Sequence, residues 1–255
     1  LEGAGAELVE LDEIAGWHLE QAVRYRQELG REVDPALARS AVAHLREAGR
    51  RAGARSDAPA ARNLLERALA IVGDAERLRG QIAVELAEQL IEVGEFDRVD
   101  ELLTAAGDDP AVAPMAMMVR FEAMERTNPE GAVPAIEAAL PGLLERFEAT
   151  GDQRGLAKAH MTAFWSYWLT SQAIPSAREL QLAAEHARKA GDEGLRALAL
   201  GWYAVTLIYG PANTHQMAEE LDEIERQHQS PYVHGQVEIC RAEVARLEGR
   251  FDEAR

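Results

Sequence analysis

Apolar residues recur along this chain at the spacing of an α-helix. Leu64, Leu65, Ala68 and Leu69, for example, lie three and four residues apart and so share one helix face. The chain has no sustained alternation of β-branched and polar residues and no Asn-Gly hairpin turn, the patterns typical of strands. The abundant Ala, Leu, Glu, Arg and Gln all favour helices. The pattern therefore predicts an all-α protein.

Short breaks divide the pattern into about twelve helices of roughly 11 to 23 residues. Each break contains Gly, Asp, Asn or Pro, because Gly closes one helix in the left-handed conformation and Asp can cap the next. Connections this short join antiparallel helices, so we expect an array of helical hairpins. The expected breaks are Gly30, Ser56-Asp57, Gly73-Asp74, Gly94, Gly107-Asp108, Asn128-Pro129, Gly151-Asp152, Gly191-Asp192, Gly210-Pro211 and Gly249.

The array has a period of about 34 to 43 residues. A small residue ends one helix, a polar and then a small or aromatic residue follow, and Ala or Val lies three positions on. This pattern is clearest at 56–71, 94–107 and 249–255, with weaker copies beginning near Asn128, Ser171 and Ala212.

The first clear unit shows how such a repeat would pack. Gly49 is the small residue of its first helix, and Ala61, Leu65 and Ala68 are the small, large and small residues of its second. Small residues let two helices approach closely, and the large one fills the gap between units. The pattern resembles the tetratricopeptide repeat (TPR), a helix–turn–helix unit of about 34 residues.

The resemblance implies a right-handed TPR-like solenoid, a single domain over residues 1–255. We expect a first helix within 1–30 and about five to six helical hairpins from residue 35. The chain stops at GRFDEAR (249–255), one turn into a further helix and without a polar capping helix. The expectation is therefore a segment truncated at its C-terminus and belonging to a longer parent.

Aromatic residues are concentrated in one region: Phe164, Trp165, Tyr167 and Trp168 lie within 157–172, and Trp202, Tyr203 and Tyr209 follow. With Ser171 and Ala212 as turn positions, the TPR register places Phe164 and Tyr167 in the core. The same register predicts a concave groove lined by Lys158, Met161, Trp165, Trp168, Trp202 and Tyr209. Two interpretations remain open: the rings fill the core, or they form a cradle for a peptide or small ligand with Lys158 at its edge.

Motifs for catalysis or metal binding are missing from the sequence. It contains no GxxxxGK(S/T) loop, no HExxH and no CxxC. His228 and His234 flank a turn without an acidic or Cys companion at a convincing spacing, so no metal and no cofactor are expected. Cys240 shares an apolar stripe with Val237 and Val244, which indicates a buried thiol. We expect no enzymatic activity in this segment.

The formal charge of -17 opposes binding to nucleic acid or to an anionic membrane. No apolar run is long enough for a transmembrane helix, and the N-terminus is acidic where a signal peptide would be basic. A single Cys and the preference for Arg over Lys are typical of a cytoplasmic protein from a GC-rich bacterium.

Several stretches resemble a more specific family, the helical region of the large bacterial STAND-type signalling ATPases. They are 14–30 (IAGWHLEQAVRYRQELG), 37–71, 149–160, 183–213 and 247–255 (LEGRFDEAR). In that family a nucleotide-binding core acts as the switch and a TPR region senses a ligand or partner. Many members carry an adenylate/guanylate cyclase domain, and others a DNA-binding domain.

The resemblance implies a non-catalytic sensing and protein-interaction region of a multidomain signal-transduction ATPase. Its partner would be a protein or peptide, or the upstream ATPase domain of the same chain. Two alternatives remain: a domain of a transcription regulator that senses a small-molecule inducer, and a stand-alone peptide-binding scaffold.

Overall fold

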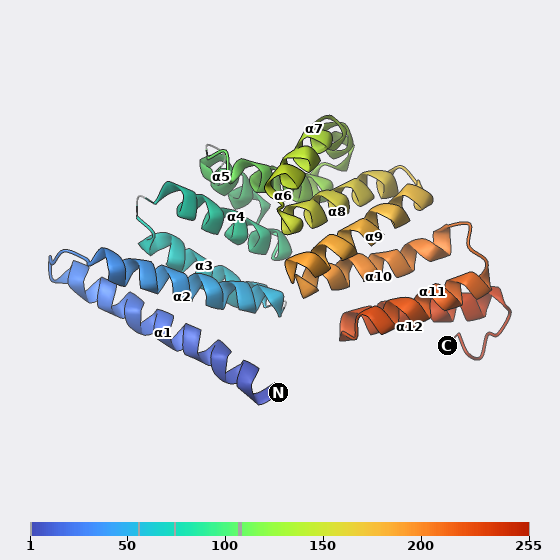
Figure 1. Ribbon diagram of the computed structural model, residues 1–255, viewed down its shortest axis with the longest axis horizontal. Helices are drawn as coiled ribbons and strands as arrows, with labels where there is room; N and C mark the ends of the chain where they lie inside the picture. The colour runs from blue at the N-terminus through green and yellow to red at the C-terminus, as the bar shows by residue number, and fades with distance from the viewer. Residues whose placement is uncertain (1, 56, 74, 107–108, 255) are drawn as a thin grey trace. The chain divides into compact units, whose positions relative to one another are not determined.

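The structure is a computed structural model that describes residues 2–55, 57–73, 75–106 and 109–254. Over these residues it contains twelve α-helices and no strand (Figure 1). The prediction of an all-α protein is confirmed. The helices fall into two compact units, Leu1–Ala123 and Met124–Arg255.

The first unit contains α1 (Glu2–Glu28), α2 (Pro35–Ala54), α3 (Ala58–Ile71), α4 (Glu76–Glu92), α5 (Phe96–Ala106) and most of α6 (Ala113–Thr127). The second unit contains α7 (Pro129–Thr150), α8 (Gln153–Leu169), α9 (Ala173–Ala190), α10 (Glu193–Tyr209), α11 (Thr214–Gln227) and α12 (Pro231–Leu247). At 27 residues, α1 is longer than the sequence pattern indicates.

Helix ends follow the capping residues in the sequence. Gly151 and Gly191 close α7 and α9 in the left-handed conformation, with φ of 69° and 70°. At the N-terminal ends of seven of the described helices, a capping side chain accepts a hydrogen bond from a backbone N–H of the first turn. These N-cap residues are Asp34, Asp57, Asn128, Asp152, Asp192, Asn213 and Ser230. Ser171, between α8 and α9, also has a positive φ, of 59°. Four expected break residues, Ser56, Asp74, Gly107 and Asp108, lie outside the described residues.

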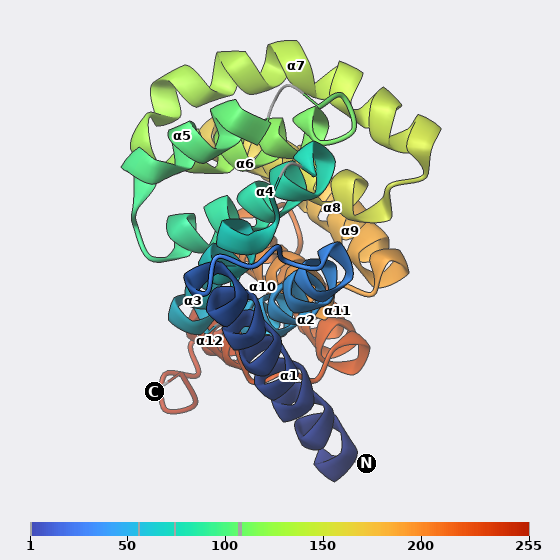
Figure 2. The same ribbon diagram turned by 90° about the vertical axis from the view of Figure 1, so that its left-hand side faces the viewer.

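Packing within each unit is between helices close in sequence. In the first unit α1, α2, α3 and α4 each contact the next helix, and α2 also contacts α4. In the second unit the same holds from α7 to α12, and α10 also contacts α8 and α12. Figure 2 shows α7 as a long curved helix; Pro134 and Pro141 lie inside it, and each removes a backbone hydrogen bond.

Each unit has its own apolar core, and small residues allow the close helix packing. A Cβ at Gly49 of α2 would lie 2.9 Å from Leu65 Cγ of α3, and Ala61, Leu65 and Ala68 are at most 1% exposed. The predicted small, large and small packing positions are therefore confirmed for this helix pair.

Beyond α12, residues 251–254 form a single turn in which the Ala254 N–H donates to the Arg250 carbonyl at 3.3 Å. The further helix expected at 249–255 is present only as this turn, because one turn gains too few hydrogen bonds to offset the cost of ordering the chain.

Two glycines of the second unit offer a test of this packing. A Cβ at Gly155 of α8 would lie 2.5 Å from Phe147 Cε1, in the buried ring of α7, whereas a Cβ at Gly142 of α7 would meet nothing within 4 Å. Gly155→Ala should lower the free energy of unfolding by about 1–3 kcal/mol through overpacking. Gly142→Ala should raise it by about 0.5–1 kcal/mol because Ala restricts the unfolded chain. Urea denaturation measures both; equal effects would contradict the close α7–α8 contact.

Candidate functional site

The aromatic residues of α8 and α10 meet in one cluster. Trp165 and Trp168 come from α8, and Trp202 and Tyr209 come from α10; we call these four side chains the ring cluster. Trp202 lies 4.9 Å from Trp165 and 5.9 Å from Trp168 between ring centroids, and Tyr209 lies 5.3 Å from Trp168. These three pairs are edge-to-face, with interplanar angles of 64–84°. The structure therefore brings together the four rings that the sequence placed on one face.

Phe164 of α8 supports the ring cluster from the core. Its ring is 0% exposed, and its centroid lies 4.9, 6.0 and 5.6 Å from Trp165, Trp168 and Trp202. The three Trp side chains are partly buried against the core of this unit, whereas Tyr209 is 66% exposed. The ring cluster therefore rests on the core, and its four side chains remain partly or mostly exposed.

Two positions of the TPR register differ from expectation. Met161, expected in the groove, is only 6% exposed and belongs to the same buried cluster as Phe164. Tyr167, expected in the core, is partly exposed in the last turn of α8. Lys158, expected at the edge of the groove, is partly buried. The register counts sequence spacing alone, so it does not include the side chains of α9 and α10 that decide what is covered.

The geometry limits what the ring cluster can bind. Rings in edge-to-face contact leave no space between them, so the cluster is not a cage that surrounds a cation. The three Trp side chains are partly exposed and Tyr209 is mostly exposed, which suits contact with the apolar or aromatic side chain of a ligand.

A buried tyrosine, which sequence reasoning placed in no role, holds α10 in position. The Tyr203 hydroxyl accepts a hydrogen bond from Gln181 Nε2 of α9 at 2.7 Å and donates one to Glu220 Oε2 of α11 at 3.1 Å. Burial, with the nearby Glu220 charge, raises the pKa of Tyr203 to about 12, so the hydroxyl stays protonated. The bonds tie the helix that carries Trp202 to both of its neighbours.

Two histidines stack between α8 and α9. The rings of His160 and His186 lie 5.4 Å apart and nearly parallel, at 10°. His160 Nδ1 is 2.7 Å from Glu179 Oε2, and His186 Nδ1 is 2.9 Å from Gln153 Oε1. Burial is the main cause that lowers the pKa of His186, and the positive charge of a protonated His160 lowers it further.

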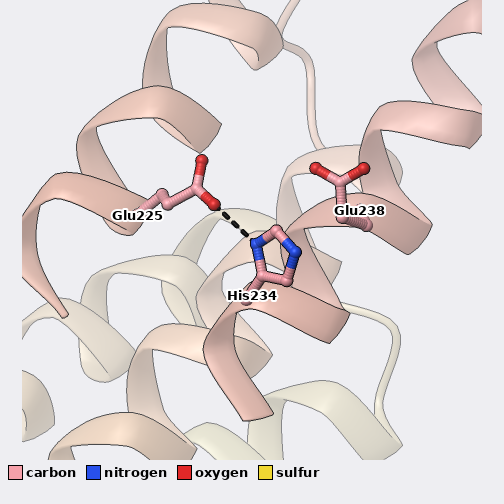
Figure 3. Close-up of side chains that lie close together, drawn as sticks. All are labelled: Glu225, His234 and Glu238. Carbon is pink, nitrogen blue, oxygen red and sulfur yellow. Dashed lines mark hydrogen bonds and ion pairs between the residues drawn. The ribbon is translucent and has the colours of Figure 1, made fainter. Parts of the chain in front are cut away.

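A second cluster of polar side chains lies at the α11–α12 hairpin. Glu225 of α11 and His234 and Glu238 of α12 each offer one potential metal-ligating atom, and these atoms lie within 4.8 Å of one another (Figure 3). Glu225 and His234 also line a cavity of about 800 Å³ at the turn between the two helices. Among the described residues this is the one such group of three or more His, Cys, Asp or Glu.

The sequence offered no acidic companion at a convincing spacing for His228 or His234, but the fold brings a carboxylate to each. His234 Nδ1 lies 2.7 Å from Glu225 Oε1, and His228 Nε2 lies 3.1 Å from Glu193 Oε2 of α10. The four-residue spacing of His234 and Glu238 was a usable signal, because it puts both on one helix face. Glu225 is brought to them by the turn.

Cys240 is fully buried, as its apolar stripe predicted. Burial, with a smaller effect of the Glu243 charge, raises the pKa of its thiol to about 11. A thiol in this environment stays protonated at neutral pH and is a poor nucleophile.

The sequence matches no protein-family model, and a search of curated proteins finds no significant match. None of the described helices is long and apolar enough to span a bilayer.

Substitution of the most buried and of the most exposed of the aromatic rings of α8 and α10 should show which of them belongs to the core. Phe164→Ala removes a fully buried ring and should lower the free energy of unfolding by about 3–5 kcal/mol. Tyr209→Ala removes a mostly exposed ring and should change it by less than about 0.5 kcal/mol. Chemical denaturation followed by circular dichroism measures both. A large loss for Tyr209→Ala would mean that the ring belongs to the core.

The histidine pair predicts a pH dependence of stability. His186 binds its proton less tightly in the folded than in the unfolded chain, because burial, His160 and Lys189 outweigh the opposite effect of Glu185 and Glu148. The contribution of His186 to the free energy of unfolding is therefore fully present above the ordinary His pKa of 6.5. It is lost as the pH falls below that value, because the unfolded chain then binds a proton that the folded chain does not.

The measurement is the free energy of unfolding from pH 8 to pH 5 for the wild type and for His186→Gln. Other groups titrate in both proteins, so the wild type should lose stability relative to the variant as the pH falls. A constant difference between the two curves would show that the His186 pKa is not lowered.

Proposed function

We propose that this chain is a TPR-like helical-repeat module that binds a protein or peptide ligand through the ring cluster. The observation that carries the proposal is the partly exposed aromatic surface formed by Trp165, Trp168, Trp202 and Tyr209. Large apolar side chains that gather at one place on a surface often mark an interaction site. Trp and Tyr are also the residues most enriched among the energetically dominant positions of protein interfaces.

The repeat architecture is supported by the packing within each unit. Most helices contact the next helix in sequence, and α2 and α4, α8 and α10, and α10 and α12 also contact each other. A solenoid has contacts of this local kind. The right-handed solenoid over 1–255 is part of the proposal. In such an array, a ligand that touches several helices can favour one curvature over another and so transmit a signal.

A peptide is favoured over an enclosed small molecule because the rings contact one another and leave no closed space between them. The charge of -17 favours a ligand that carries positive charge beside its apolar side chains. We therefore propose a basic segment with one or two aromatic or branched apolar side chains as the occupant. No catalytic role is proposed for this segment.

The wider role follows from the resemblance of the sequence. We propose that the module is the sensing region of a bacterial signalling ATPase of the STAND type, acting in the cytoplasm, with a cyclase domain as one form of output. Its input would be the ligand of the ring cluster, and its effect would pass to an upstream ATPase domain of the same chain.

The test is selection of peptides from a displayed random library against the full chain. Synthetic copies of the enriched peptides are then measured by calorimetry against the wild type, Tyr209→Ala and Trp17→Ala. Trp17 of α1 is the matched control, since it is a 49% exposed aromatic residue outside the ring cluster. Tyr209→Ala should weaken binding by about tenfold or more, the loss of about 1.4 kcal/mol or more typical of an important interface ring.

Trp17→Ala should bind as the wild type does, and added salt should weaken binding if the peptide is basic. Enriched peptides that bind all three proteins equally would contradict the ring cluster as the site. A library that yields no peptide with apolar and basic residues would contradict the proposed occupant.

A further inference from the structure

The α11–α12 hairpin carries three side chains arranged as a metal site. His234 and Glu238 are four residues apart on α12, and Glu225 lies near the end of α11, where the turn returns the chain. Figure 3 shows the imidazole of His234 between the carboxylates of Glu225 and Glu238. One ligand atom from each of the three residues lies within 4.8 Å of those from the other two, a spacing that slight side-chain rotation can close around one ion.

The donor atoms select the kind of metal. One imidazole nitrogen and two carboxylates form a mixed nitrogen and oxygen set, which suits Zn²⁺ and neighbouring transition-metal ions. Mg²⁺ and Ca²⁺ prefer oxygen donors alone and gain little from the imidazole. Three protein ligands also leave at least one coordination position for water or for a donor from a bound partner.

Arg241 of α12 binds the same carboxylates. Its guanidinium lies 2.8 Å from Glu225 Oε2 and 2.7 Å from Glu238 Oε1, and it donates to Asp222 Oδ1 at 2.6 Å. A metal ion therefore has to displace the guanidinium that forms ion pairs with Glu225 and Glu238. The ion pair with Asp222 does not involve the proposed ligands, so Arg241 keeps one partner when it gives up the other two.

We propose that Glu225, His234 and Glu238 bind Zn²⁺ or a similar divalent transition-metal ion in competition with Arg241. The ion links α11 to α12 across their turn and stabilises the hairpin by binding the folded chain alone. It sits at the edge of the cavity of about 800 Å³, so its open coordination position is accessible. The proposal is independent of the ring cluster and of the function proposed for it.

The experiment is thermal unfolding and calorimetric titration of the full chain with Zn²⁺, with Mg²⁺ as the comparison ion. The wild type should gain thermal stability as Zn²⁺ is added and none with equal Mg²⁺. His234→Ala should weaken Zn²⁺ binding by about tenfold or more, as expected when a metal site loses part of its coordination. Absence of Zn²⁺ binding by the wild type, or unchanged binding by His234→Ala, would overturn the proposal.

The matched control is His215→Ala. His215 of α11 is 81% exposed and pairs with Glu219 four residues later, at 3.6 Å, so it repeats the His–Glu spacing without belonging to the proposed site. This variant should bind Zn²⁺ as the wild type does. A loss equal to that of His234→Ala would assign the binding to scattered surface histidines and would overturn the proposed site.

A second variant tests the competition. Arg241→Gln removes the guanidinium from the two carboxylates and should raise the affinity for Zn²⁺ several-fold. The quantity compared is the change in unfolding temperature that Zn²⁺ causes within one variant. A general loss of stability in that variant therefore does not affect the comparison. Unchanged or weaker Zn²⁺ binding would show that Arg241 does not compete with a metal, and would leave the carboxylates as its ion-pair partners alone.

Discussion

Close contact between a small residue on one helix and a large side chain on the next is the interaction on which this structure depends. A Cβ at Gly155 would meet the ring of Phe147 on α7, and one at Gly201 of α10 would lie 2.6 Å from Tyr232 Cε1 of α12. Each contact fixes how near two helices approach, and helices mainly contact near neighbours in sequence. The placement of each helix therefore follows mainly from its contacts with helices near it in sequence.

The ring cluster is a consequence of that packing. Helix α9 packs on both α8 and α10, and Tyr203 ties α10 to α9 and α11, so the aromatic residues of α8 and α10 are held against one another. Phe164 fills the space beneath, and the Trp side chains are left with one side against the core and one toward solvent. A rigid aromatic surface costs little conformational entropy when a ligand binds, because its rings are already ordered.

The α11–α12 hairpin of the same unit presents charged side chains rather than aromatic ones. Its outer surface is rich in carboxylates, and Arg241 forms ion pairs with three of them, Asp222, Glu225 and Glu238. The side chains of Arg241 and Glu225 are partly exposed and that of Glu238 is exposed, so water solvates the separated charges and limits what these ion pairs contribute to stability. The pairing of Arg241 can therefore be exchanged for a stronger one at small cost, which is the physical basis for competition between its guanidinium and a metal ion.

The sequence by itself determined the helices and their ends. Periodicity and capping by Gly, Asp and Asn act between residues near in the chain, so Asp152, Gly151 and Gly191 mark boundaries that the structure retains. The repeat register also predicted that the rings at 165, 168, 202 and 209 lie close together, and the structure brings them into contact. Tertiary structure alone decided how deeply each side chain is covered: Met161 is buried and Tyr167 is not, because covering depends on side chains of neighbouring helices. It alone also brought Glu225 to His234, since the two lie on different helices and only the path of the turn sets the 2.7 Å between their atoms.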